Sequence, residues 1–250
     1  MKQNRMMLNW LVGLGLAFCL TSSALAQAMG ERTAQVVRIK GQARYSTGNN
    51  VWQPLTVGTT IRAGYIIQTA ADSFVDLVLG ETAPGPSRVI VGNVITYTPR
   101  VEQDVIRIFA DSVLGFDKLA MMKTGADEVT DTQLDLRAGK IFGSVRKLSP
   151  ASRYEVKLPN GVAGVRGTTF TITAAGVIQV TSGSVVVSWT GPDSKPMTQV
   201  VNAGYQFDLR TLSLTPLPPE QGGVPTISSV SAAREVAIDT TIYYVSPRVP

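Results

Sequence analysis

The chain has 250 residues, of which 44% are hydrophobic and 16% charged, and its formal net charge is +5. It contains no histidine and a single cysteine, Cys19. This is not the composition of a disordered chain, and the charge is too small to indicate nucleic-acid binding. Without histidine, the chain can form neither a Ser-His-Asp triad nor a zinc site built from histidine and cysteine.

Residues 1–26 have the order of a secretory signal peptide. A basic start precedes an apolar run at 6–20, and Ala24 and Ala26 supply the small residues that signal cleavage requires. We therefore expect the mature chain to begin at Gln27. No later apolar run is long enough to span a membrane, so no transmembrane span is expected after cleavage.

Two alternatives exist for this segment: an uncleaved anchor, or a lipoprotein signal that ends at Cys19. Phe18 occupies the position where lipoprotein signals need a small residue, which disfavours the second alternative. Cleavage after Ala26 would remove the cysteine, so the mature chain could form no disulfide.

Beyond the signal, apolar and polar residues often alternate with a period of two, and glycine and proline interrupt the pattern at short intervals. Such alternation predicts an all-β fold made of many short strands. The expected strands include residues 36–39, 74–79, 89–91, 94–97, 154–158, 168–173, 176–181 and 184–189.

A short unit of the form apolar-x-small-Gly-x-apolar recurs at 61–66, 136–141 and 180–185, and in part at 201–205. Each copy is expected to form a tight turn or bulge in which glycine has a positive φ. The recurrence favours stacked short hairpins, forming a β-roll or solenoid-like sandwich, over a closed barrel.

Two neighbouring segments have opposite charge: residues 101–135 are acidic and residues 137–166 are basic. Within the acidic segment, residues 111–122 are expected to form a helix capped by Asp111 or Ser112. We expect the two segments to pair with each other. The alternative is a basic face that is free for an anionic envelope ligand.

The segment from Pro159 to Phe170 combines Pro-Asn-Gly, a short apolar run and Arg-Gly-Thr. It closely resembles the signature of the FecR domain, a module of the bacterial cell envelope. Weaker resemblance extends from about residue 35 to 206. The signature positions are Pro159, Gly161, Gly164, Arg166, Gly167, Thr168 and Phe170.

The resemblance implies a FecR-like all-β domain at 33–208, followed by a Pro/Ser/Thr-rich and mostly irregular tail at 209–250. Founding members of the family relay a signal from an outer-membrane receptor to a sigma factor, through one membrane span and a cytoplasmic anti-sigma segment. Here a signal peptide occupies the start of the chain, so we expect the exported module without those attachments.

Within the signature, Thr168 and Thr169 are β-branched, so a chain reversal is expected at Gly167 or Gly164. Arg166 is expected to be partly buried and to lock this turn. The alternative role for Arg166 is to anchor a ligand.

No catalytic residue, cofactor or metal is predicted. Ser144 with Lys147, and Ser194 with Lys195, match no known catalytic motif.

A group of carboxylates is expected in a solvated loop, with calcium binding or a glycosidase pair as alternatives. These residues are Asp127, Glu128, Asp131 and Asp135.

Sugar binding would use exposed aromatic rings, for which Trp52, Trp189, Tyr65 and Tyr205 are candidates, although core packing is the expected role. The sequence thus predicts an exported, non-enzymatic binding or scaffolding module whose partner is an envelope protein or glycan. A regulator of envelope signalling that acts by protein contact is the alternative, and a polysaccharide hydrolase is the third option.

Overall fold

The computed structural model describes residues 29–80, 88–91, 94–97, 104–125, 127–191 and 193–217. The regular secondary structure in these ranges consists of β-strands alone, which confirms the predicted all-β class. None of the described segments is a helix that could cross a membrane. The expected signal peptide lies outside the described residues, and so does the expected tail from residue 218 onward.

The described strands follow one another closely along the chain. They are β1 (Gly30–Glu31), β2 (Ala34–Lys40), β3 (Ala43–Ser46), β4 (Trp52–Pro54), β5 (Thr60–Ile61), β6 (Ile66–Thr69), β7 (Phe74–Leu79), β8 (Arg88–Val91), β9 (Val94–Tyr97), β10 (Asp104–Ile108), β11 (Val113–Thr124), β12 (Asp127–Ala138), β13 (Lys140–Ser144), β14 (Arg153–Leu158), β15 (Gly161–Thr173), β16 (Val177–Thr190), β17 (Pro196–Asn202), β18 (Tyr205–Asp208) and β19 (Ser213–Pro216).

Strand pairing divides the main sheet into two layers. In the first layer the order is β5, β2, β7, β10, β13, the second half of β15, the first half of β16, β18 and β19. In the second layer it is β4, β3, β6, β11, β12, β14, the first half of β15, the second half of β16 and β17. Only β12 and β14 pair in parallel among these strands, and β8 and β9 form a separate two-stranded sheet.

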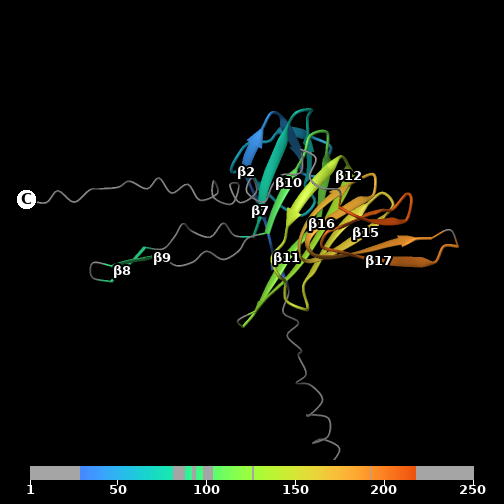
Figure 1. The fold of residues 1–250 in the computed structure, drawn as a ribbon. Helices are drawn as coiled ribbons and strands as arrows, with labels where there is room; N and C mark the ends of the chain where they lie inside the picture. The colour runs from blue at the N-terminus through green and yellow to red at the C-terminus, as the bar shows by residue number, and fades with distance from the viewer. Residues whose placement is uncertain are drawn as a thin grey trace, which may run out of the picture.

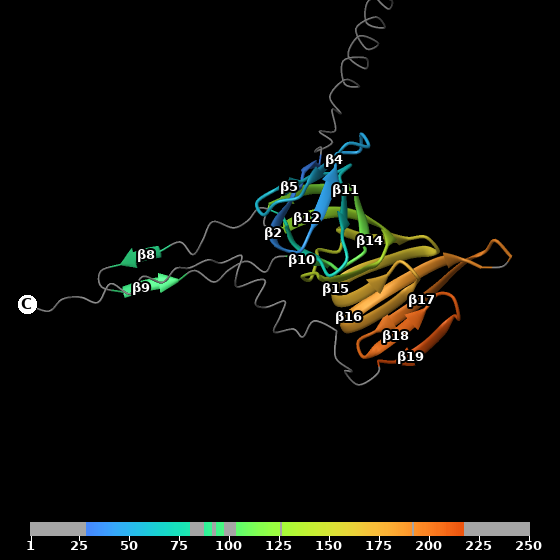
Figure 2. The same cartoon turned by 90° about the horizontal axis from the view of Figure 1, so that it is seen from above.

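The two layers enclose one apolar core. Its buried side chains come from both layers, for example Leu77 and Ile106 from the first and Leu134 and Val187 from the second. Figures 1 and 2 show the early strands in blue at one end of the stack and the late strands in orange at the other. Each successive hairpin therefore lies on the one before it, as the recurrent glycine unit predicted.

Three corners with the same construction carry strands from one layer to the other. At each corner a serine or threonine hydroxyl donates to the carbonyl two residues earlier, at 2.9, 3.0 and 3.0 Å. The same oxygen accepts the N–H that follows a glycine of the opposite strand, at 2.9, 2.9 and 3.3 Å. The hydroxyl and glycine pairs are Ser73 with Gly41, Ser112 with Gly139, and Thr168 with Gly183.

Each corner also needs an unusual backbone conformation. The three glycines have φ values of +77°, +78° and +78°, and a Cβ at any of them would collide with the hydroxyl-bearing residue opposite. The residue before each hydroxyl also has a positive φ: Asp72 at 53°, Asp111 at 52° and Gly167 at 62°. Two of the recurrent glycine units, at 136–141 and 180–185, therefore lie at corners, and Gly64 and Gly204 of the other two also have positive φ.

The expected helix at 111–122 is wrong, because these residues form most of β11, which pairs with β12 from Val113 to Thr124. Asp111 is a turn residue with positive φ and not a helix cap. Leu114, Phe116 and Leu119 are buried in the core. Pairing and burial along the whole strand outweigh the modest helix propensity of its leucine and methionine residues.

Candidate functional site

The aromatic candidates have different environments. Trp189 packs against Phe207 with ring centroids 5.4 Å apart, so it belongs to the core periphery. Tyr65 stacks on Tyr45 at 5.9 Å, whereas Tyr205 is 42% exposed. Core packing is therefore the role of two of the four candidates.

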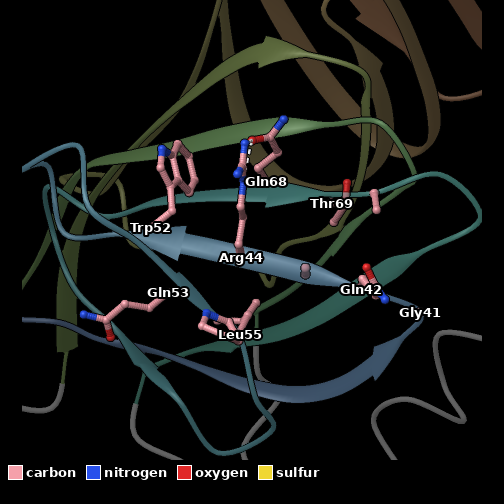
Figure 3. Close-up of a pocket in the computed structure, with 11 residues that line it drawn as sticks. Gly41, Gln42, Arg44, Trp52, Gln53, Leu55, Gln68 and Thr69 are labelled. Carbon is pink, nitrogen blue, oxygen red and sulfur yellow. Dashed lines mark hydrogen bonds between the residues drawn. The ribbon is translucent and has the colours of Figure 1, made fainter.

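Trp52 lines a hollow of about 790 Å³ beside β3, β4 and β6. The guanidinium of Arg44 lies 4.7 Å from the centroid of its ring. Arg44 also donates from Nε and Nη2 to Oε1 of Gln68, at 3.0 and 2.8 Å. The three side chains come from three neighbouring strands and lie together above β3 (Figure 3).

The oppositely charged segments pair with each other in the described structure, as expected. The connecting ion pairs are Arg137–Asp135 at 2.7 Å, Arg146–Glu128 at 2.6 Å and Lys157–Asp117 at 2.7 Å. The hydrogen bond from Lys157 to Asp117 raises the pKa of the lysine. Three of the seven cations of the basic segment are thus paired with the acidic segment, and Arg153 pairs with Glu155.

Two cations of the basic segment, Lys147 and Arg166, have neither a charged partner nor an aromatic ring beside them among the described residues. Both are exposed, and their backbones lie close together, because a Cβ on Gly167, the residue after Arg166, would be 3.3 Å from Cα of Lys147. By contrast, Lys140 lies over the ring of Phe109 at 4.4 Å.

These two cations line one groove of about 640 Å³. The groove is also lined by the Arg146–Glu128 pair, by Asp127 and by the loop residues at 148–150. Its charged lining is mixed, with the two unpaired cations beside two carboxylates. It can therefore receive an isolated anion, whereas the carboxylates disfavour a dense polyanion.

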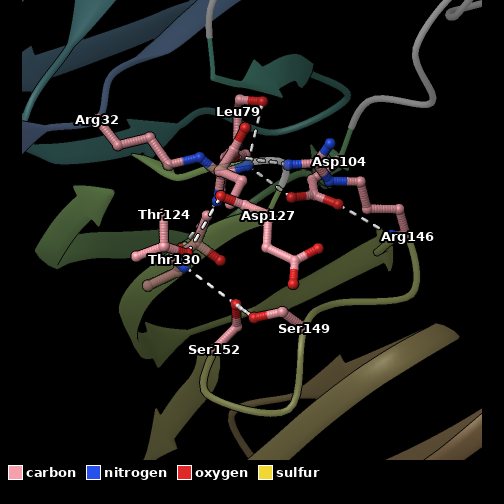
Figure 4. A network of polar contacts seen from close by, with 11 residues as sticks. Arg32, Leu79, Asp104, Thr124, Asp127, Thr130, Arg146, Ser149 and Ser152 are labelled. Carbon is pink, nitrogen blue, oxygen red and sulfur yellow. Dashed lines mark hydrogen bonds and ion pairs between the residues drawn. The ribbon is translucent and has the colours of Figure 1, made fainter. Parts of the chain in front are cut away.

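A buried polar network joins Arg32 and Asp104 to the loop that contributes to the groove (Figure 4). Nη2 of Arg32 is 2.6 Å from Oδ2 of Asp104, and both side chains are almost fully buried. Oδ1 of the same carboxylate accepts the backbone N–H of Arg146 at 2.9 Å. The Arg32–Asp104 pair thus anchors the start of the loop that carries Lys147.

The rest of the loop is held by serine hydroxyls. Oγ of Ser152 accepts the N–H of Thr130 at 3.0 Å and lies 3.0 Å from Oγ of Ser149. Tyr154 lies nearby, and burial together with the charge of Asp104 raises the pKa of its phenol. The groove is therefore built on a firmly bonded loop.

The signature segment does not form a reversal at Gly167 or Gly164, so that expectation is wrong. The turn falls at Pro159 and Asn160, and β15 then runs without interruption from Gly161 to Thr173. Gly167, with a φ of +62°, forms a bulge at the point where β15 crosses from one layer to the other. Gly164 has no positive φ.

The remaining signature residues have separate structural positions. Thr168 supplies the corner hydroxyl, and a Cβ on Gly161 would lie 2.6 Å from the carbonyl oxygen of Ser188. Phe170 is fully buried and covers Gly143 on the neighbouring strand. The side chain of Arg166 is exposed and makes no hydrogen bond or ion pair with another described residue, so it does not lock a turn.

The expected acidic loop is also wrong, because its carboxylates belong to β12. Asp131 pairs with Lys118 at 2.6 Å, and Asp135 and Glu128 have the arginine partners named above. Among the described residues no group of three or more potential metal ligands is found.

Sequence reasoning missed the buried ion pairs. Asp76 interrupts the apolar run of β7, and it accepts from Arg107 at 2.6 Å and from Arg38 at 2.7 Å. Asp104 likewise begins the apolar strand β10. An acidic residue within or beside an apolar strand is the signal that could have identified both pairs, because a buried charge requires a partner.

Comparison with known proteins places the groove within a recognised domain. Residues 102–187 match the family model described as FecR protein, and they include Glu128, Lys147 and Arg166. Two crystal structures of "a putative anti-sigma factor" from Parabacteroides distasonis resemble the chain with TM-scores of 0.34 and 0.33, at 17% and 18% identity. These matches cover 54% of this chain and 65% and 66% of the solved chains. No curated protein matches the chain. The family match confirms the resemblance seen in the sequence, and it covers residues 102–187.

Proposed function

We propose that the protein is exported and acts as a non-enzymatic binding module of the bacterial cell envelope. Its partner is an envelope protein that places the carboxylate of an acidic segment between Lys147 and Arg166. The observation that carries this proposal is the pair of adjacent, exposed cations that lack a charged partner among the described residues.

Electrostatics support an anionic ligand at this position. Adjacent like charges repel, and a bound carboxylate would offset the repulsion through charge-assisted hydrogen bonds. Asp127 and Glu128 line the same groove and would repel a second nearby anion. An isolated Asp or Glu side chain of a partner fits this arrangement better than a phosphate-rich surface does.

Export is supported by the order of residues 1–26, which combine a basic start, an apolar run and small residues before Gln27. Mass spectrometry of the protein purified from the envelope should find Gln27 as the first residue. A chain that still begins at Met1, or one with a lipid on Cys19, would contradict export by this route.

Photocrosslinking in cells tests the binding role. A photoreactive amino acid at Pro150, an exposed residue of the groove lining, leaves both cations and the serine hydroxyls of the loop in place. We expect one protein to be crosslinked, and we expect Lys147→Glu combined with Arg166→Glu to abolish that crosslink. Lys195→Glu, outside the groove lining, is the control and should leave it unchanged. A crosslink that survives the double charge reversal would show that the groove is not the contact.

The FecR match favours a second candidate, a regulator of envelope signalling that acts by protein contact. The same experiment distinguishes the two roles through the identity of the crosslinked protein. An outer-membrane receptor domain would support signalling, whereas a structural envelope protein would support scaffolding.

A further inference from the structure

The hollow beside β3, β4 and β6 lies outside the residues that match the FecR family. Its lining combines one indole ring, one guanidinium, several side-chain amides and the apolar surface of Pro54 and Leu55. We infer that this hollow binds a saccharide, with Trp52 as the stacking ring and Arg44 and Gln68 as the hydrogen-bonding groups.

The hydrogen bonds of Arg44 fix the orientation of the polar groups. The Nε and Nη2 groups of Arg44 both donate to Oε1 of Gln68, and this orients the amide nitrogen of Gln68 away from the guanidinium. A guanidinium has five N–H donors, so several donors of Arg44 remain for a ligand. Two planar groups with fixed orientation can therefore meet the hydroxyl groups of a sugar ring.

Trp52 supplies the apolar part of the site. It is half-buried, on the short strand β4, and its partner across the sheet is Ser46. The guanidinium held 4.7 Å from its ring centroid fixes the indole beside the polar groups. An amphipathic ring of this kind can contact the C–H face of a sugar while neighbouring side chains bind its hydroxyls.

Charge narrows the class of saccharide. Arg44 is the one ionisable residue among the described residues that line the hollow. A neutral sugar or a uronic acid is compatible with this lining, whereas a cationic amino sugar is not. The inference does not depend on the groove at Lys147 and Arg166, which other strands form.

The test is a titration of the chain beginning at Gln27 with maltotetraose, chitotetraose and tetragalacturonate. The readout is the NMR signal of the indole N–H groups of Trp52 and Trp189. The chitotetraose is the fully N-acetylated and therefore neutral tetramer. We expect at least one of these saccharides to shift the Trp52 signal saturably and to leave the Trp189 signal unchanged. Trp52→Ala and Arg44→Gln should each weaken binding by about tenfold or more, the effect of one lost anchoring contact.

Two control variants test whether saccharide binding depends on the hollow at Trp52 and not on other parts of the surface. Tyr205→Ala removes an exposed aromatic ring outside the hollow and should not change the affinity. Lys147→Gln with Arg166→Gln should also leave saccharide binding intact, even though it removes the proposed protein contact. The inference is overturned if none of the three saccharides shifts the Trp52 signal. It is also overturned if Arg44→Gln, in a folded protein, binds as tightly as the parent.

Discussion

Gly164 and Gly167 lie three residues apart in β15. Only Gly167 has a positive φ, a backbone conformation that residues other than glycine rarely adopt. Its φ is +62°, and it lies against the backbone of Lys147. At Gly164, the nearest atom to a new Cβ would be the carbonyl oxygen of Val186 at 3.6 Å, an ordinary contact.

Gly167→Ala should therefore lower the free energy of unfolding by about 1–3 kcal/mol, the cost of a non-glycine residue in this region. Gly164→Ala is the matched control and should change it by no more than about 0.5 kcal/mol. Denaturant unfolding measures both values. Equal midpoints for the two variants would show that β15 has no strained bulge.

The carboxylate of Asp104 should contribute far more to stability than a surface carboxylate does. Asp104→Asn leaves Arg32 with a weakened partner in a buried site, and losses of about 3–5 kcal/mol are typical when one member of a buried pair is removed. Asp131→Asn, which breaks the partly exposed pair with Lys118, should cost about 0–1 kcal/mol. Urea unfolding of both variants makes the comparison, and similar losses would contradict the buried network.

At the scale of elements, the corners explain how short hairpins become two layers. Each one requires a hydroxyl opposite a glycine, and Ala-Asp-Ser occurs at both 71–73 and 110–112. The third corner uses Arg-Gly-Thr at 166–168. This part of the signature segment therefore forms the same kind of corner as the two Ala-Asp-Ser segments.

Ser112→Ala should lower the free energy of unfolding by about 1–3 kcal/mol, because it leaves the partly buried N–H of Lys140 without its acceptor. Ser213→Ala, on the exposed strand β19, should change stability by less than about 0.5 kcal/mol. Thermal unfolding followed by circular dichroism provides both values. A neutral Ser112→Ala would mean that water satisfies this group and that the corner does not need the hydroxyl.

The sequence was sufficient to predict the all-β class and the stacking of short hairpins. Both follow from the local alternation of apolar and polar residues and from the recurrent glycines. It was misleading at 111–122, where leucine and methionine suggest a helix but long-range pairing with β12 decides the outcome. From the sequence alone, the bulge at Gly167 could not be distinguished from a chain reversal, because both require a residue with positive φ. The meeting of Lys147 with Arg166, and of Arg44 with Trp52, depends on strand register, which alternation alone does not specify.

For the whole molecule, the paired charges predict a modest dependence of stability on salt. The three ion pairs that join the acidic and basic segments are partly exposed, and such pairs contribute about 0–1 kcal/mol each. Raising sodium chloride from about 0.05 to about 0.5 M screens them. The melting temperature should then fall by about 2–4 °C, which corresponds to about 1 kcal/mol for a chain of this size. A melting temperature that rises over this range would contradict internal pairing.

The two unpaired cations at the groove carry the central functional claim, and one calorimetric titration tests it most directly. The ligand is the peptide Gly-Ser-Gly-Glu-Gly-Ser-Gly, with blocked ends, and its analogue with Gln in place of Glu is the control. We predict saturable binding of the Glu peptide alone, at about millimolar affinity. We further predict that Arg166→Gln abolishes it, whereas Arg153→Gln, which removes an equal charge from a surface pair with Glu155, does not. Equal binding of the two peptides, or equal loss in the two variants, would contradict a carboxylate site at Lys147 and Arg166.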